Sequence, residues 1–201
     1  HNLEDQVETF LIRLSRGSGL KGLSAMKTLS NFNNKAKIYR PLLDVKKNQL
    51  IKISRLVFGK YIKDPSNHNS KYLRTNIRKL KKPLEQSGIN YDQIIRSIKN
   101  LASSSSTLES YFKKTFKEIV RKKKNLLLIN ITKFNCLNNE TKMTLINNSI
   151  RTLKGNYYNL RSKKVMNLIN NLSNKNFSKS TLGGCLFIKK PGYLTLKLEK
   201  K

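Results

Sequence analysis

The spacing of apolar residues constrains the fold of this chain more than any other feature of its sequence. In residues 2–15 the apolar side chains recur at helical spacing, at Leu3, Val7, Phe10, Leu11 and Leu14. Because an α-helix has about 3.6 residues per turn, this spacing places them on one helical face. The same criterion predicts further helices over residues 50–57, 70–86, 91–101, 108–120, 139–153 and 160–172. We therefore expect a folded chain with a modest core.

A few short strands are predicted between and after these helices. Residues 37–40 and residues 126–131 have the apolar, β-like character of strands. Near the end of the chain, two apolar runs flank Pro191 and Gly192. Proline followed by glycine suits the centre of a type II turn, so we expect a β-hairpin over residues 181–198.

The chain is predicted to form two domains. Ser87 and Gly88 mark a boundary that separates residues 1–87 from residues 88–201. Within the second part, the serines at residues 103–106 predict a loop between two helices. The basic run that begins at Arg121 is expected at the C-terminal end of the second of these helices, where cations interact favourably with the helix dipole.

The charge of the chain indicates a polyanionic partner. Forty-two Lys and Arg side chains against 11 Asp and Glu give a formal net charge of +31. Such an excess costs self-repulsion in the compact state and is typical of proteins that bind nucleic acid. We expect no membrane partner, because no apolar run approaches the roughly 18–20 residues of a spanning helix. Compositional drift is the alternative source of part of the charge, since Asn, Lys and Ile are all frequent, as AT-rich coding produces.

The cysteine content excludes a disulfide framework. Cys136 and Cys185 are too few and too far apart in the sequence for a disulfide scaffold or a CxxC metal site. We expect both to be reduced, which fits a cytoplasmic protein.

Two carboxylates on the first predicted helix are candidates for a functional site. Asp5 and Glu8 are three residues apart and therefore share a helical face. Such a pair can hold Mg²⁺ or the ammonium group of a substrate, and a solvated helix face is the alternative for so generic a pattern.

A glycine-rich turn follows this helix and is a second candidate. It contains Arg16, Gly17, Ser18, Gly19 and Gly22. Loops of this kind let backbone N–H groups approach phosphate closely. The turn matches neither the Walker A nor the GxGxxG pattern, so a plain helix C-cap is the alternative.

The predicted helix over residues 70–86 supplies a third group of candidates. Arg74 and Arg78 share one face of this helix, as do Tyr72 and Asn76. Paired guanidinium groups suit bidentate contact with phosphate, and a solvated basic helix is the alternative.

In order and spacing, these segments resemble the tRNA(Ile)-lysidine synthase family. The family motifs HxxxDQxET and RGSGxxGLxxM are matched at residues 1–9 and 16–26. The motifs RPLL, DPSN and YxRNxIR are matched at residues 40–43, 64–67 and 72–78. Two positions depart from the pattern. Glu4 stands where many members have Asp, and Thr75 separates an Arg and an Asn that are usually adjacent.

The resemblance implies an α/β fold. Residues 1–87 are then the C-terminal part of a Rossmann-like, PP-loop ATP-pyrophosphatase catalytic domain, and residues 88–201 are a mainly helical tRNA-binding domain that ends in the β-hairpin. The family's SGGxDS phosphate loop would precede His1. On this interpretation we expect the N-terminal part of the catalytic domain to be missing and the chain alone to be inactive.

The resemblance also implies a reaction. ATP adenylates the 2-carbonyl oxygen of the wobble cytidine in tRNA(Ile) with a CAU anticodon, and the ε-amine of free L-lysine then displaces AMP. In this scheme Asp5, Glu8 and Arg74 are catalytic, and Asp5 also binds Mg²⁺. The residues implied to bind the nucleotide are Arg16, Gly17, Ser18, Gly19, Gly22 and Arg78. We expect the acidic pair, the glycine-rich turn and Arg74 to border one cleft.

Contacts with tRNA are expected from the second domain. The basic candidates are Arg121, Lys122, Lys123, Lys124, Arg161, Lys163 and Lys164. Tyr157 and Tyr158, close to Arg161, could stack on an unpaired base. The sequence is compatible with a monomer or a homodimer.

Two alternative functions remain open at this level. A related PP-loop enzyme could thiolate a tRNA base, although the scattered cysteines do not favour sulfur transfer. The chain could also be a non-catalytic RNA-binding fragment, which its charge favours.

Overall fold

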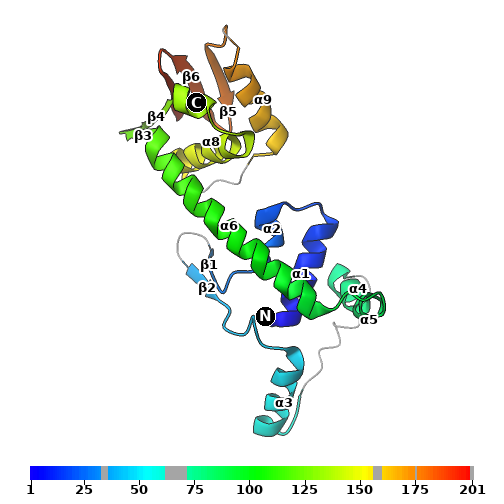
Figure 1. Cartoon of the computed structure of the whole chain (residues 1–201). Coiled ribbons are helices and arrows are strands. Elements are labelled where there is room, and N and C mark those ends of the chain that lie inside the picture. The colour runs from blue at the N-terminus through cyan, green and yellow to red at the C-terminus, as the bar shows by residue number, and fades with distance from the viewer. Residues whose placement is uncertain (33–35, 62–71, 156–159, 175, 200–201) are drawn as a thin grey trace. The chain divides into compact units, whose positions relative to one another are not determined.

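The computed structural model describes residues 1–32, 36–61, 72–155, 160–174 and 176–199 (Figure 1). These residues form two compact units, His1–Thr107 and Leu108–Lys201, and each is described by itself. The mixed α/β class predicted from the sequence is confirmed. The DPSN motif at residues 64–67 and the tyrosines at residues 157 and 158 lie outside the described residues. Within the described part of the chain, none of the helices has the length and apolar character needed to cross a membrane.

The first unit is built around helix α1 (Leu3–Ser15). A capping box starts this helix: Asp5 donates its backbone N–H to Asn2 Oδ1, and Asn2 donates its own to Asp5 Oδ2. These two bonds satisfy backbone donors that the first helical turn leaves without partners. The helix predicted over residues 2–15 is therefore confirmed.

The other elements of the first unit follow α1 in the chain. They are α2 (Leu20–Leu23), β1 (Leu29–Phe32), β2 (Ala36–Tyr39), α3 (Lys47–Phe58), α4 (Leu73–Lys79), α5 (Lys81–Gln86) and the first part of α6 (Tyr91–Ile119). β1 and β2 form a two-stranded antiparallel sheet, and Gly59 ends α3 in the left-handed conformation at φ +68°. The strand predicted at residues 37–40 is thus confirmed. The helix predicted over residues 70–86 is divided between α4 and α5 at Leu80.

The core of the first unit lies between α1 and the start of α6. Its buried residues are Leu3, Val7, Ala25, Tyr91, Ile94, Ile95 and Ile98, and Phe10 and Leu11 pack against them. Because these α6 residues belong to the first core, the two compact units divide after Thr107, whereas the sequence placed a boundary after Ser87. The functions assigned to the two domains stay predictions.

Helix α6 is continuous through residues 103–106, so the predicted loop at these serines is wrong. The apolar stripes on either side are in phase, because Ile98, Ser105, Phe112 and Ile119 follow one another at seven-residue intervals. Two helices that share one phase can join without a break, and Ser105 is buried on the common face. Serine has only a modest helix penalty, which this continuity offsets.

The described residues of the second unit form the last part of α6, a five-stranded antiparallel sheet with the order β3-β4-β7-β6-β5, and three further helices. The strands are β3 (Val120–Lys123), β4 (Leu126–Asn130), β5 (Lys179–Leu182), β6 (Cys185–Lys190) and β7 (Tyr193–Leu198). The helices are α7 (Ile131–Asn135), α8 (Asn139–Lys154) and α9 (Ser162–Leu172). The predicted hairpin is confirmed: Lys190 pairs with Tyr193, and Gly192 in the turn has φ +73°.

The core of the second unit gathers apolar residues from the sheet and from α7, α8 and α9. The fully buried members include Leu127, Ile129, Ile146, Val165 and Phe187. The basic run directly follows the C-terminal end of α6 and lies on β3, where buried Val120 pairs with Ile129. The favourable helix-dipole interaction of this run stays a prediction.

Candidate functional site

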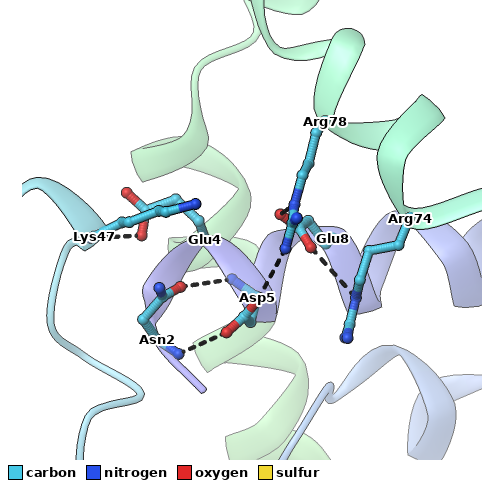
Figure 2. Close-up of polar contacts among 7 residues, drawn as sticks. All are labelled: Asn2, Glu4, Asp5, Glu8, Lys47, Arg74 and Arg78. Atoms are coloured by element: carbon cyan, nitrogen blue, oxygen red, sulfur yellow. Dashed lines mark hydrogen bonds and ion pairs between the residues drawn. The ribbon is translucent and has the colours of Figure 1, made fainter. Parts of the chain in front are cut away.

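Acidic residues of α1 and basic residues of α4 meet where these two helices pack together (Figure 2). Arg78 donates its Nε–H to Glu8 Oε1 at 2.6 Å. Arg74 Nε lies 3.3 Å from Glu8 Oε2, and an Arg78 Nη atom lies 3.7 Å from Asp5 Oδ1. Of the residues expected to border one cleft, Asp5, Glu8 and Arg74 therefore lie together, and Arg78 joins them. We call these four residues the acid–arginine cluster.

Local sequence explains why α4 presents both arginines to α1. Thr75 and Ile77 are buried and anchor the inner face of α4, while Arg74 and Arg78 are one helical turn apart. Thr75, which departs from the family pattern, thus has a packing role. Both guanidinium groups engage the carboxylate of Glu8 through their Nε atoms.

Glu8 is the buried centre of the cluster. Its side chain is 4% exposed, and its Oε2 makes no hydrogen bond among the described residues, although Arg74 pairs with it electrostatically. Burial raises the pKa of Glu8, and the hydrogen bond and charge of Arg78 partly offset this rise. The same hydrogen bond raises the pKa of Arg78. Burial of the carboxylate thus disfavours its ionised form, and the positive charges of the two arginines partly offset this effect.

Asp5 has a structural role as well as a place in the cluster. Its Oδ2 accepts the backbone N–H of Asn2 at 2.9 Å in the capping box, and its Oδ1 faces Arg78. The guanidinium beside Oδ1 weakens the attraction of Asp5 for any cation, and the role of Asp5 as a ligand of Mg²⁺ stays a prediction. Within the described ranges, no group of three or more His, Cys, Asp or Glu side chains could hold a metal ion.

The glycine-rich turn lies at the other end of α1. At a rise of about 1.5 Å per residue, Gly17 is roughly 14 Å along the helix axis from Glu8. Arg16, Gly17, Ser18 and Gly19 therefore do not join the acid–arginine cluster. Gly17 has φ +66°, and its N–H bonds to Leu14 O, as in a helix C-cap.

The chain returns along α1 after this turn, held by two side chains that sequence reasoning missed. Gln6 forms two hydrogen bonds with the backbone of Met26, at 2.8 and 2.9 Å. Arg13 donates to the carbonyl oxygens of Gly22 and Ala25, at 2.7 and 2.9 Å. Gln6 lies within the first motif and Arg13 lies just after it. Their partners are backbone groups, which every residue carries, so the sequence gives no sign of these contacts.

The predicted tRNA-binding residues occupy two places in the second unit. Arg121, Lys122 and Lys123 are exposed on the edge strand β3, and Lys124 in the following turn has φ +26°. Arg161 is the N-cap residue of α9, and Lys163 and Lys164 lie in its first turn. Cations at a helix N-terminus interact unfavourably with the helix dipole.

Comparison with known proteins places the first unit in a class. Residues 1–84 match the family model of the PP-loop domain. The acid–arginine cluster lies entirely within this matched region, so the site belongs to the part of the chain that is similar to PP-loop proteins.

The relatives identify the branch of this class. The chain is 33% identical over 187 residues to the tRNA(Ile)-lysidine synthase of Wolbachia pipientis wMel, covering 92% of this chain and 43% of that protein. It is 32% identical over 159 residues to the enzyme of Zymomonas mobilis, covering 78% and 47%. The enzyme of Orientia tsutsugamushi is 45% identical over 84 residues, which are 42% of this chain and 19% of that protein. The chain is thus a member of the tRNA(Ile)-lysidine synthase family, and it spans less than half the length of these relatives.

Proposed function

We propose that the protein is an ATP-dependent ligase that joins lysine to the wobble cytidine of CAU-anticodon tRNA(Ile). The names of the relatives and the match to the PP-loop domain support ATP-dependent tRNA modification. The observation that carries the proposal is the convergence of the first and last matched motifs, where Arg74 and Arg78 meet Asp5 and Glu8.

The proposed reaction has two steps. The 2-carbonyl oxygen of the cytidine attacks the α-phosphate of ATP, and pyrophosphate leaves. The uncharged ε-amine of lysine then attacks C2 of the adenylated base, and AMP leaves with the former carbonyl oxygen. Adenylation is needed because it turns a poor leaving group into a good one, and the amine must lose a proton to become a nucleophile.

The structure supports distinct roles for Glu8, Arg74 and Asp5 of the acid–arginine cluster. Glu8 is too buried and too closely paired to bind lysine directly in this arrangement, and it orients both arginines. Arg74, with its side chain 44% exposed, is placed to contact a phosphate oxygen. Asp5, with its side chain 17% exposed, is the better placed carboxylate for an ammonium group of lysine. The glycine-rich turn would contribute separately to nucleotide binding.

The test is lysine-dependent release of AMP. The protein encoded by the complete open reading frame is incubated with ATP, L-lysine and an unmodified tRNA(Ile) transcript carrying CAU, and the digested tRNA is analysed by mass spectrometry for lysidine. The matched control is the same transcript with uridine in place of the wobble cytidine. AMP release that needs both lysine and the cytidine supports the proposal.

Two other results would favour the alternatives. Tight, salt-sensitive tRNA binding without AMP release would indicate an RNA-binding protein, which the net charge of +31 favours. A sulfur-containing product would indicate thiolation. Cys185 is fully buried and burial raises the pKa of its thiol, so it is poorly suited to sulfur transfer.

A further inference from the structure

Two side chains of α1 hydrogen-bond to the backbone of residues 22–26, which lie along this helix. Gln6 and Arg13 are one heptad apart and lie on one helical face. Gln6 holds Met26, and Arg13 holds Gly22 and Ala25. The segment therefore runs back along α1, from the level of Arg13 to the level of Gln6.

The pairing between Gln6 and Met26 fixes the register of this segment. Met26 donates its N–H to Gln6 Oε1, and Gln6 Nε2 donates to Met26 O, so the side-chain amide pairs with the backbone as a neighbouring strand would. Gln6 is 9% exposed. A buried two-bond contact of this kind allows one register, because any slip would leave polar groups without partners.

Arg13 stabilises a turn that is unfavourable by itself. Ala25 has φ +54°, a conformation that residues with a Cβ rarely adopt. Its carbonyl is held by Arg13, and the next N–H in the chain is held by Gln6. At Gly22, an added Cβ would lie 2.7 Å from Ser18 Cβ, so the segment is also closely packed where it leaves the glycine-rich turn.

This return path changes which part of the second motif lies level with the acid–arginine cluster along the axis of α1, on another face of the helix. Gly17 and Gly19 are at the far end of α1, whereas Met26 is level with Gln6, the residue next to Asp5. The backbone at Met26 is therefore the part of the motif that the fold brings back to the functional end of α1.

We propose that Gln6 and Arg13 are positioning residues that hold residues 22–26, which follow the glycine-rich turn, in register with α1 and thereby shape the site for the small substrates. The inference rests on the proposed function for the identity of those substrates. Neither residue needs to touch a substrate, since each acts through the backbone of residues 22–26.

Hydrogen exchange of the 201-residue chain tests the contact itself. Gln6→Met and Arg13→Met remove the hydrogen bonds and keep comparable side-chain bulk, and Ser15→Ala on exposed α1 surface is the control. We expect amide exchange at Met26 to rise roughly tenfold in Gln6→Met, the change expected for loss of one average hydrogen bond. Exchange at residues 22–26 that is unchanged in both variants would overturn the proposal.

Gln6→Glu separates a specific contact from general packing. An ionised Glu keeps the acceptor for the Met26 N–H but loses the donor, whereas a protonated Glu restores a donor. Protection of Met26, corrected for intrinsic exchange, should therefore recover as the pH falls. Protection that is insensitive to pH, or equal to that of Gln6→Met throughout, counts against the proposal.

Kinetics of the protein encoded by the complete open reading frame test the consequence. We expect Gln6→Met to raise the KM for ATP or L-lysine roughly tenfold and to leave the KM for tRNA unchanged. Faster exchange at Met26 with both small-substrate KM values unchanged would contradict a positioning role. If the wild-type protein releases no AMP, the proposed function fails, and the exchange experiment still decides whether Gln6 and Arg13 hold the segment.

Discussion

The guanidinium Nε of Arg78 lies 2.6 Å from Oε1 of Glu8, across 70 residues of sequence. This hydrogen bond joins α4 to α1. It brings the motif at residues 1–9 and the motif at residues 72–78 into one cluster. It also changes the interpretation of Glu8. The glutamate is the buried partner of two arginines, and only Asp5 of the acidic pair is left partly accessible.

Loss of Arg78 should destabilise the first unit. Arg78→Gln leaves the carboxylate of Glu8 buried with Arg74, the weaker of its two partners. We expect the unfolding free energy to fall by about 3 kcal/mol. This value is at the low end for buried ion pairs because the Arg78 side chain is 30% exposed. Urea denaturation monitored by circular dichroism measures it. The double variant Glu8→Gln/Arg78→Gln should be less destabilised than Arg78→Gln alone, and purely additive effects would show that the two residues are not coupled.

The destabilisation by Arg78→Gln should also depend on pH. Burial raises the pKa of Glu8 in the folded state above its ordinary value of 4.5, and Arg78 lowers it. A raised folded-state pKa stabilises the fold below pH 4.5, and this contribution is lost as the pH rises through the folded-state pKa. Without Arg78 the rise is larger, so the deficit against wild type should be greater at about pH 8 than at about pH 5. A deficit that is equal at both values would contradict an ionised Glu8 as the partner of Arg78.

Alanine in place of the exposed serines of α6 should stabilise the helix. Ser103, Ser104 and Ser106 are exposed, and each replacement should add about 0.5 kcal/mol, because alanine is the better helix former. The measurement is thermal unfolding by circular dichroism. Ser105→Ala, at a buried position, is the control for changes in packing. Reduced helix content in the triple variant would show that the serines do more than continue the helix.

Stability and RNA binding should respond in opposite directions at the start of α9. Lys163→Gln removes a cation from the first turn, which should stabilise the second unit by about 0.3–1 kcal/mol. If Lys163 contacts a phosphate, the same change weakens tRNA binding and lowers the slope of log Kd against log salt concentration by about 1. Lys117→Gln, in the last turn of α6, is a control that should lower stability. Unaltered tRNA affinity and salt slope in Lys163→Gln would remove this residue from the interface.

The two cysteines should differ in reactivity. Cys136 is exposed, and Cys185 is fully buried with a thiol pKa that burial raises. Iodoacetamide should therefore modify Cys136 in the folded protein and reach Cys185 upon unfolding. Peptide mapping by mass spectrometry distinguishes the two sites, with the urea-unfolded chain as the control. Rapid labelling of Cys185 in the folded protein would contradict the packing of β6.

Much of the local structure followed from the sequence because it depends on residues a few positions apart. Helical spacing located α1, α3, α8 and α9, and Pro191 with Gly192 located the terminal hairpin. The seven-residue phase shared by Ile98, Ser105 and Phe112 was also present in the sequence. Because a run of serines is typical of loops, a loop was predicted over residues 103–106, where α6 is continuous.

The sequence by itself determined the amphipathic helices, the hairpin, the high positive charge and the motifs whose order indicates the family. Tertiary structure decided which of the candidate residues meet: it buried Glu8 between Arg74 and Arg78, left the glycine-rich turn at the far end of α1, and gave Gln6 and Arg13 their backbone partners. The physical reason is range. Periodicity, capping and turn formation are interactions within a few residues, whereas the partner of a buried charge or amide is set by how distant segments pack.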